Sequence, residues 1–197
     1  MAFRTLSVEE FSDMLAAKTP TPGGGAVAAV TASHAAALGA MVLEFTLGKP
    51  KFAEHEASNA SALARLRELR HEALELADRD AEAYGALNAL WKLPKDAPAR
   101  LTAWDAAVAA AIDAPQAILD RAAEIAVTCV ALAPRTNANL ASDLAIAVDL
   151  ARVAARAAAH NVDVNLPSVA DAADRDARRA RMDHALREAG AGGTHGA

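Results

Sequence analysis

Residues 26–43 form a run without Asp, Glu, Lys or Arg, rich in Ala and other small residues and carrying a single His. Small side chains of this kind are typical of a helix that packs closely against its neighbours. The run barely reaches the length of a membrane span and is weakly apolar, so a buried bundle helix is the simpler interpretation. The preceding stretch 20–25, "PTPGGG", predicts a turn, or a place where bare backbone meets a ligand.

The rest of the chain also favours helices. Aromatic residues make up only 4% of the sequence, and no segment alternates with a period of two for long enough to predict a strand. We therefore predict an all-α fold, an Ala-rich up-and-down bundle of long helices. The expected helices cover 7–17, opened by a Ser7/Glu10 capping box, then 26–47, 52–91, 100–112, Pro115 to near 133, 138–160 and 169–189. Residues 161–167 are expected to be a connection.

Length and composition set further limits. The 197 residues predict one domain over 1–190 and a flexible tail over 191–197. A single cysteine, Cys129, excludes an intrachain disulfide, and no signal peptide is evident, so we expect a cytoplasmic protein. The net charge of −5 speaks against a nucleic-acid partner, and we expect no membrane partner.

Two polar residues interrupt a 3/4-spaced apolar stripe that runs from Leu63 to Trp91, namely Arg70 and Asp80. A carboxylate on a core-facing stripe is costly unless it is paired or belongs to a site. Asp80 either pairs with Arg70 or with an arginine of another helix, or it is a functional residue, and the pattern favours neither alternative.

Asp143 is the second unusual acid. The helix after Asn137 has an apolar face that begins at Leu144, and Asp143 flanks this face instead of lying on the solvated stripe. Asn137 or Asn139 is a candidate N-cap, and acids favour the first turn of a helix, which accounts for an acid here but not for its position beside the buried face. The pattern therefore favours a site.

The remaining polar candidates have simple structural interpretations. Lys49, Lys51 and Arg135 follow helix ends, where cations are favoured. Cys129 and His34 lie on apolar segments and are expected in the core. No Cys/His spacing predicts a metal site. Two asparagines in "NVDVN" are either turn formers or amides that face a cleft, Asn161 and Asn165.

Taken in order, "TPTPGGGAVAA", "TLGKPKF", "DRDAEAYGALNALWKLPK", "NANLASD" and "NVDVN" resemble the formiminotetrahydrofolate cyclodeaminase / methenyltetrahydrofolate cyclohydrolase family over nearly the whole chain. The resemblance implies an all-helical enzyme, usually a homodimer with a reduced folate in a cleft near the subunit interface, and no metal or cofactor beyond tetrahydrofolate itself. Two departures from the family pattern are the run 135–137, "RTN", and His34.

The resemblance also implies site residues. Asp143, Lys49 and Asp80 fall on its motif positions. We expect Asp143 to be the carboxylate that shuttles the proton, Asp80 to be the second carboxylate or its orienter, and Lys49 to be a proton donor or a clamp on a substrate carboxylate. The positions it implies for substrate binding are Gly23, Gly24, Gly25, Asn139, Ser142, Asn161 and Asn165, and Arg135 is a candidate for the glutamate tail of the folate.

The function hypothesis is the interconversion of 5,10-methenyltetrahydrofolate and 10-formyltetrahydrofolate, a cyclohydrolase. One alternative is a cyclodeaminase that releases ammonia from formiminotetrahydrofolate. Another is a non-catalytic folate-binding or dimeric helical scaffold.

Overall fold

The computed structural model describes residues 2–190, and these residues form helices and no strand. The α-helices are α1 Val8–Ala16, α2 Gly24–Glu44, α3 Glu56–Trp91, α4 Pro98–Leu132, α5 Ala141–Asn165 and α6 Ala172–Gly190. Short 3-10 turns occupy Phe3–Thr5, Pro50–His55, Ala133–Arg135, Ala138–Leu140 and Leu166–Ser168. The all-α prediction is confirmed, and the expected tail 191–197 lies outside the described residues.

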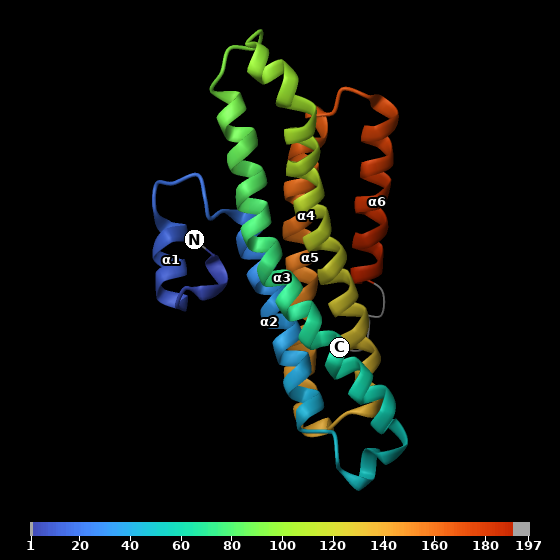
Figure 1. Ribbon diagram of the computed structural model, residues 1–197. Helices are drawn as coiled ribbons and strands as arrows, with labels where there is room; N and C mark the ends of the chain where they lie inside the picture. Colours follow the sequence, from blue (N-terminus) through green and yellow to red (C-terminus); the bar gives the residue numbers. More distant parts are fainter. Residues whose placement is uncertain (1, 191–197) are drawn as a thin grey trace.

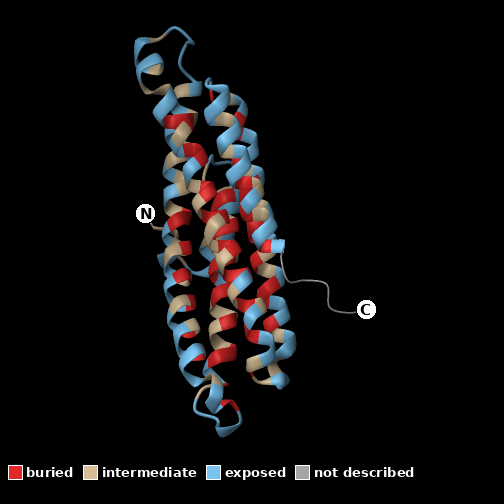
Figure 2. Cartoon of the chain, turned by 90° about the vertical axis from the view of Figure 1, so that its right-hand side faces the viewer, coloured by how far each residue is buried: buried red, intermediate tan, exposed pale blue. Residues whose placement is uncertain are grey.

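Helices α2 to α5 run up and down in turn and form the bundle, with α6 packed on α4 and α5 (Figure 1). The buried residues line the inner faces of these helices (Figure 2). Helix α1 carries the predicted capping box, in which the Ser7 hydroxyl accepts from the Glu10 amide at 3.1 Å. It stands to one side of the bundle, where the Phe3 amide donates to the Asp78 carboxylate at 2.7 Å.

Helix α2 is the charge-free helix, and eleven of its residues are buried against α3, α4 and α5. By length and composition it is the one candidate membrane span among the described residues. Its small side chains let the neighbours approach, since a Cβ on Gly39 would lie 2.7 Å from the Cys129 sulfur. Burial of Cys129 is confirmed and raises the pKa of its thiol to about 12. His34 is exposed on the outer side of α2, so the core prediction for it was wrong.

Pro115 corrects another prediction, because it lies inside α4 and does not begin a new helix. A proline within a helix has no N–H for the carbonyl four residues earlier, here Ala111. The Asn165 amide donates to that Ala111 carbonyl at 3.0 Å and so replaces the missing bond from a different helix. Both partners are buried, and the replacement lets α4 continue through the proline.

Replacing Asn165 with alanine is therefore expected to destabilise the fold by about 1–3 kcal/mol, because the buried Ala111 carbonyl loses its donor. The loss should shrink in a Pro115→Ala background, where residue 115 supplies its own N–H to Ala111. Urea denaturation of the four proteins in this cycle measures the coupling. Equal losses in both backgrounds would contradict the role assigned to Asn165.

Several helix boundaries and one stripe also differ from the predictions. Helix α5 continues through Asn165, so most of the expected connection at 161–167 is helical. Asn137 caps the 3-10 turn before α5, where its side chain accepts from the Asn139 amide at 3.2 Å. On α3 five residues of the predicted stripe are buried, Leu63, Leu66, Ala73, Ala77 and Leu87, and Leu69 and Leu76 widen the buried side. Trp91, at the predicted end of the stripe, is exposed.

Candidate active site

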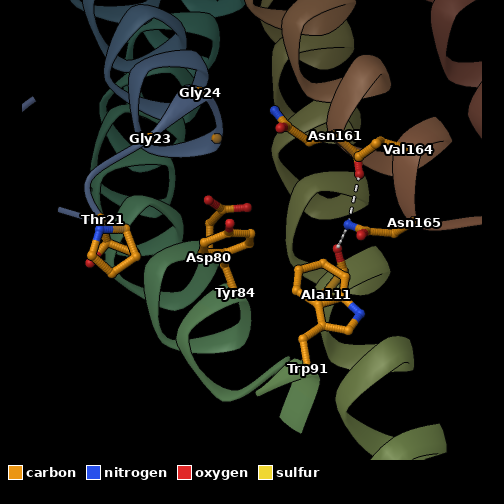
Figure 3. Close-up of a pocket in the computed structure, with 12 residues that line it drawn as sticks. Thr21, Gly23, Gly24, Asp80, Tyr84, Trp91, Ala111, Asn161, Val164 and Asn165 are labelled. Atoms are coloured by element: carbon orange, nitrogen blue, oxygen red, sulfur yellow. Dashed lines mark hydrogen bonds between the residues drawn. The ribbon is translucent and has the colours of Figure 1, made fainter. Parts of the chain in front are cut away.

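A cavity of about 450 Å³ opens where α2 begins. Gly25, in the first turn of α2, lies against Asp80 of α3, and α3 continues beyond this level to Trp91. Roughly the last 15 Å of α3 are therefore not covered by α2. The turn before α2 forms one wall, α3 the floor, and the last turn of α5 the opposite wall (Figure 3). The predicted residues Gly23, Gly24, Gly25, Asp80, Asn161 and Asn165 all line it.

Asp80 lies in this cavity, below the glycine turn (Figure 3). Burial raises the pKa of its carboxyl group to about 6. Within residues 2–190 no cation forms an ion pair with it, and Arg70 lies instead 3.0 Å from the ring of His71. The interpretation of Asp80 as half of a structural ion pair was therefore wrong, and a partly buried, unpaired carboxyl group remains in a cleft.

Gly25 is the glycine that Asp80 requires. A Cβ at position 25 would overlap the carboxyl group of Asp80, whereas one at position 24 would lie 3.6 Å from the Asn161 side chain, an ordinary contact. Helix α2 has no side-chain cap at Gly23, so its first N–H groups remain open at the cavity. The glycines therefore do more than form a turn, because the absence of a side chain at Gly25 lets the backbone lie against the Asp80 carboxyl group.

Two aromatic residues at the cavity were not predicted as site residues, Tyr84 and Trp91. Their rings meet edge to face, with centroids 6.2 Å apart, and both remain partly exposed. They continue the α3 stripe past Asp80 at one- and three-turn spacing, so their helical position was available from the sequence. What the sequence did not reveal is that α2 begins too late to cover them.

The two asparagines of α5 have different roles. The side-chain amide of Asn165 donates both of its hydrogens, one to the Ala111 carbonyl and one to the Asn161 carbonyl, each at 3.0 Å (Figure 3). It is therefore foremost a structural residue that lines the site. Asn161 donates one hydrogen to the Ala157 carbonyl at 3.1 Å, which leaves the rest of its amide to face the cavity.

The other predicted residues lie at the opposite end of the bundle. Asp143 is in the first turn of α5, and the Asn137 amide donates to Thr46 at 3.1 Å, which places this end of α5 beside the end of α2. About 29 Å of helix separates Gly25 from that level. The residues at this end are Lys49, Arg135, Asn139, Ser142 and Asp143. Within one chain, the structure does not bring them to Asp80.

A buried polar pair at this end was not predicted from the sequence. Asn59 is fully buried, and its amide donates to the Arg135 carbonyl at 3.0 Å. The Asn59 carbonyl oxygen and the Arg135 Nε have no partner among the described residues. Asn59 lies one turn before Leu63 on the α3 stripe, so the signal that revealed Asp80 was present for it too.

A second cavity of about 490 Å³ also lies near this end, between the end of α4 and the start of α5. Its wall is mainly apolar, and it contains none of the predicted site residues. Within residues 2–190 no group of three or more His, Cys, Asp or Glu side chains forms a metal cluster. The first cavity, with its unpaired carboxyl group, is the better candidate for chemistry.

Comparisons with known proteins agree over nearly the whole chain. The family model described as "Formiminotransferase-cyclodeaminase" matches residues 7–184. The methenyltetrahydrofolate cyclohydrolase of Methylorubrum extorquens is 35% identical over 189 residues, which are 94% of this chain and 91% of that protein. The formimidoyltransferase-cyclodeaminase of Rattus norvegicus is 28% identical over 187 residues, and the match spans 93% of this chain but only 35% of that protein.

The crystal structure of a formiminotetrahydrofolate cyclodeaminase from Thermotoga maritima superposes with a TM-score of 0.81 at 28% identity and covers 94% of both chains. These matches, the helical bundle and the cavity with its glycine turn lead to one conclusion. The chain belongs to the formiminotransferase-cyclodeaminase family.

Proposed function

We propose that this protein is a folate one-carbon enzyme that hydrolyses 5,10-methenyltetrahydrofolate to 10-formyltetrahydrofolate. The observation that carries the proposal is the unpaired Asp80 carboxyl group in the cavity, with a pKa raised to about 6. The relative named as a cyclohydrolase, which this chain matches over 91% of its length, supports this activity.

The methenyl bridge of the substrate is a cation, and a carboxylate beside it stabilises the positive charge. Water adds to the bridge carbon between N5 and N10, and Asp80 takes one proton from that water as the C–O bond forms. In the second step the bond from carbon to N5 breaks and the carbonyl forms. N5 takes the proton held by Asp80, and the remaining hydroxyl proton leaves to solvent, so that one proton is released overall.

The rest of the cavity supports this step. The open N–H groups at the start of α2 favour the oxygen as it gains negative charge. Tyr84 and Trp91 offer aromatic faces and edges to the planar rings of a folate. Asn161 has free hydrogen-bonding capacity for the polar edge of the pterin.

The proposed enzyme activity requires no metal or cofactor besides the folate. In this proposal the protein acts in the cytoplasm as a homodimer, with the site near the subunit interface. Burial of the Cys129 thiol supports a reducing compartment, since this chain offers no disulfide.

The cyclodeaminase reaction passes through a similar tetrahedral carbon. It is the second candidate because of the close structural match to the Thermotoga maritima enzyme.

The test measures loss of the methenyltetrahydrofolate absorbance after subtraction of the spontaneous hydrolysis. A parallel assay supplies formiminotetrahydrofolate and detects ammonia. Faster turnover of the methenyl compound supports the cyclohydrolase, and faster release of ammonia would replace it with the cyclodeaminase. If neither substrate is converted, the enzyme proposal fails and a folate-binding scaffold remains.

The pH profile is a further prediction. If Asp80 must be ionised to accept the proton, kcat/KM for hydrolysis should be level above pH 6 and should fall about tenfold per pH unit below it. Initial rates between pH 4.5 and 8 measure the profile. An apparent pKa near 4, the usual value for an exposed aspartate, would contradict the role of a buried Asp80.

A further inference from the structure

The second cavity, of about 490 Å³, lies where α6 stops short of the two helices on which it packs. Helix α6 ends at Gly190, and the carbonyl of Ala189 accepts a hydrogen bond from the Nε of Arg152 at 3.1 Å. From that level α5 extends back by about 16 Å to its start at Ala141, packed along α4 (Figure 1). Over this length α6 does not cover the groove between α4 and α5, and the cavity occupies it.

The wall of this cavity is mainly apolar. Helix α4 contributes Cys129 and Val130, α5 contributes Leu144 and Val148, and the turn over residues 133–138 closes the end far from α6. The volume lies within the range of about 300–1,000 Å³ that is usual for small-molecule sites, which are also mostly apolar with a few polar groups. The shape and the wall therefore favour a small ligand whose body is apolar.

Arg152 is the cation in this wall, at the end of the cavity next to α6. Side chains of a helix lean towards its N-terminus, which for Arg152 is the direction of the cavity. Its Nε is bonded to the Ala189 carbonyl, but its Nη2 nitrogen is buried and has no hydrogen-bond partner within residues 2–190. A guanidinium group stays charged at every ordinary pH, and a buried charged donor without an acceptor is costly. An anion that accepts from Nη2 removes this cost.

We propose that the second cavity binds a small monocarboxylate with an apolar chain of medium length, such as octanoate. The carboxylate accepts a charge-assisted hydrogen bond from the Nη2 of Arg152. The chain of the ligand lies in the groove between α4 and α5 and points towards the turn over residues 133–138. This site is separate from the cavity that contains Asp80, which borders the last turn of α5 and not its first half. The inference goes beyond the proposed function and does not depend on it.

The charges of the wall favour a monocarboxylate over a more highly charged anion. Arg152 is the one Lys or Arg residue that lines the cavity, and Asp149 is an exposed acid that also lines it. A phosphate dianion would meet a single cation and would be repelled by this acid, and it has no apolar part to bury. The two oxygens of a carboxylate match the planar fork of a guanidinium group, and the apolar chain matches the rest of the wall.

The first test is calorimetric titration of the protein with octanoate and with 1-octanol, which has the same chain but no charge. Arg152→Met keeps an apolar side chain of similar length and removes the donors. We expect it to weaken octanoate binding about 10–100-fold, the usual contribution of a hydrogen bond to a charged group, and to leave 1-octanol binding nearly unchanged. A wild-type chain that does not bind octanoate, or equal octanoate affinity in the two proteins, would overturn the proposal.

The second test fills the cavity and leaves Arg152 in place. Ala145 lines the cavity and is exposed, so Ala145→Trp adds an indole to the groove without repacking the core. This variant should lose octanoate binding. The matched control is Arg156→Met, which removes an exposed arginine one turn further along α5 and should bind octanoate as the wild type does. Urea denaturation checks that each variant is folded. Wild-type octanoate affinity in Ala145→Trp would place the ligand elsewhere and refute the assignment.

The third test distinguishes the ligand from the chain's own residues 191–197, which follow Gly190 in the sequence. Replacing both Thr194 and His195 with glycine removes the two largest side chains of this segment. Under the proposal, the octanoate affinity of this variant equals that of the wild type. A rise in affinity of tenfold or more would mean that the segment competes for the cavity, and would assign the cavity to the chain itself. Inorganic phosphate at the same concentration should not displace octanoate, and displacement would reduce the site to a general anion site.

Discussion

Replacing Asp80 with asparagine should lower kcat/KM for methenyltetrahydrofolate hydrolysis by about 10²–10⁴-fold, the usual contribution of a placed acid–base group. The same substitution should raise the thermal stability at neutral pH. The asparagine keeps the shape of the side chain but carries no charge. Burial disfavours the ionised form of Asp80 in the folded state, and this is why its pKa is raised. Loss of activity with a gain of stability separates a functional carboxylate from a structural one.

The sign of the pH dependence follows from the two pKa values of Asp80, about 6 in the folded state and 3.8 for an aspartate in water. Between these values the folded state binds more protons than the unfolded state, so the free energy of unfolding falls as the pH rises. Below about pH 4 both states are protonated and the penalty vanishes, and above pH 6 it is complete, at most about 3 kcal/mol.

The measurement is therefore a comparison of Tm for Asp80→Asn and wild type at pH 4 and pH 7.5. The variant should be the more stable protein at pH 7.5 only. Glu82→Gln is the matched control, since Glu82 is exposed on the same helix and should change neither turnover nor stability. An Asp80→Asn variant with wild-type turnover would remove Asp80 from the mechanism.

Gly25→Ala is expected to lower both stability and turnover. The added methyl group overlaps the Asp80 carboxyl group, so the carboxyl group or the start of α2 must move. Forced insertion of a methyl group into a packed site typically costs about 1–3 kcal/mol. Because the displaced group is Asp80, turnover should fall with it.

A double-mutant cycle isolates this contact. In an Asp80→Ala background the methyl group of Gly25→Ala meets no carboxyl group, so its cost in urea denaturation should largely disappear. Gly24→Ala is the control and should leave stability nearly unchanged, because its Cβ makes only an ordinary contact with Asn161. If the two alanine substitutions behave alike, the close approach of Gly25 to Asp80 has no energetic importance.

The sequence predicted the helices and the half of the site that surrounds Asp80, since each depends on local periodicity. It did not predict that Pro115 lies inside α4, because the bond that permits this comes from Asn165 on another helix. It also did not reveal that Tyr84 and Trp91 border a cavity, because their exposure depends on where α2 begins relative to α3.

Asp143 and Lys49 show a different limit. Their residue types and spacing predicted site residues. Whether they lie close to Asp80 depends on their height along the bundle axis, and they lie at the opposite end from Asp80. This height depends on the lengths of α2 and α5 and on the connections between the helices.

The bond from Asn165 to the Ala111 carbonyl also constrains how this chain evolves. Once Pro115 is lost, α4 makes its own bond and position 165 is free to drift. Loss of Asn165 first leaves a buried carbonyl without a donor, so that order of events is disfavoured by selection. Two positions fifty residues apart thus form one heritable unit with a preferred direction of change, and relatives without Asn165 should lack Pro115 as well.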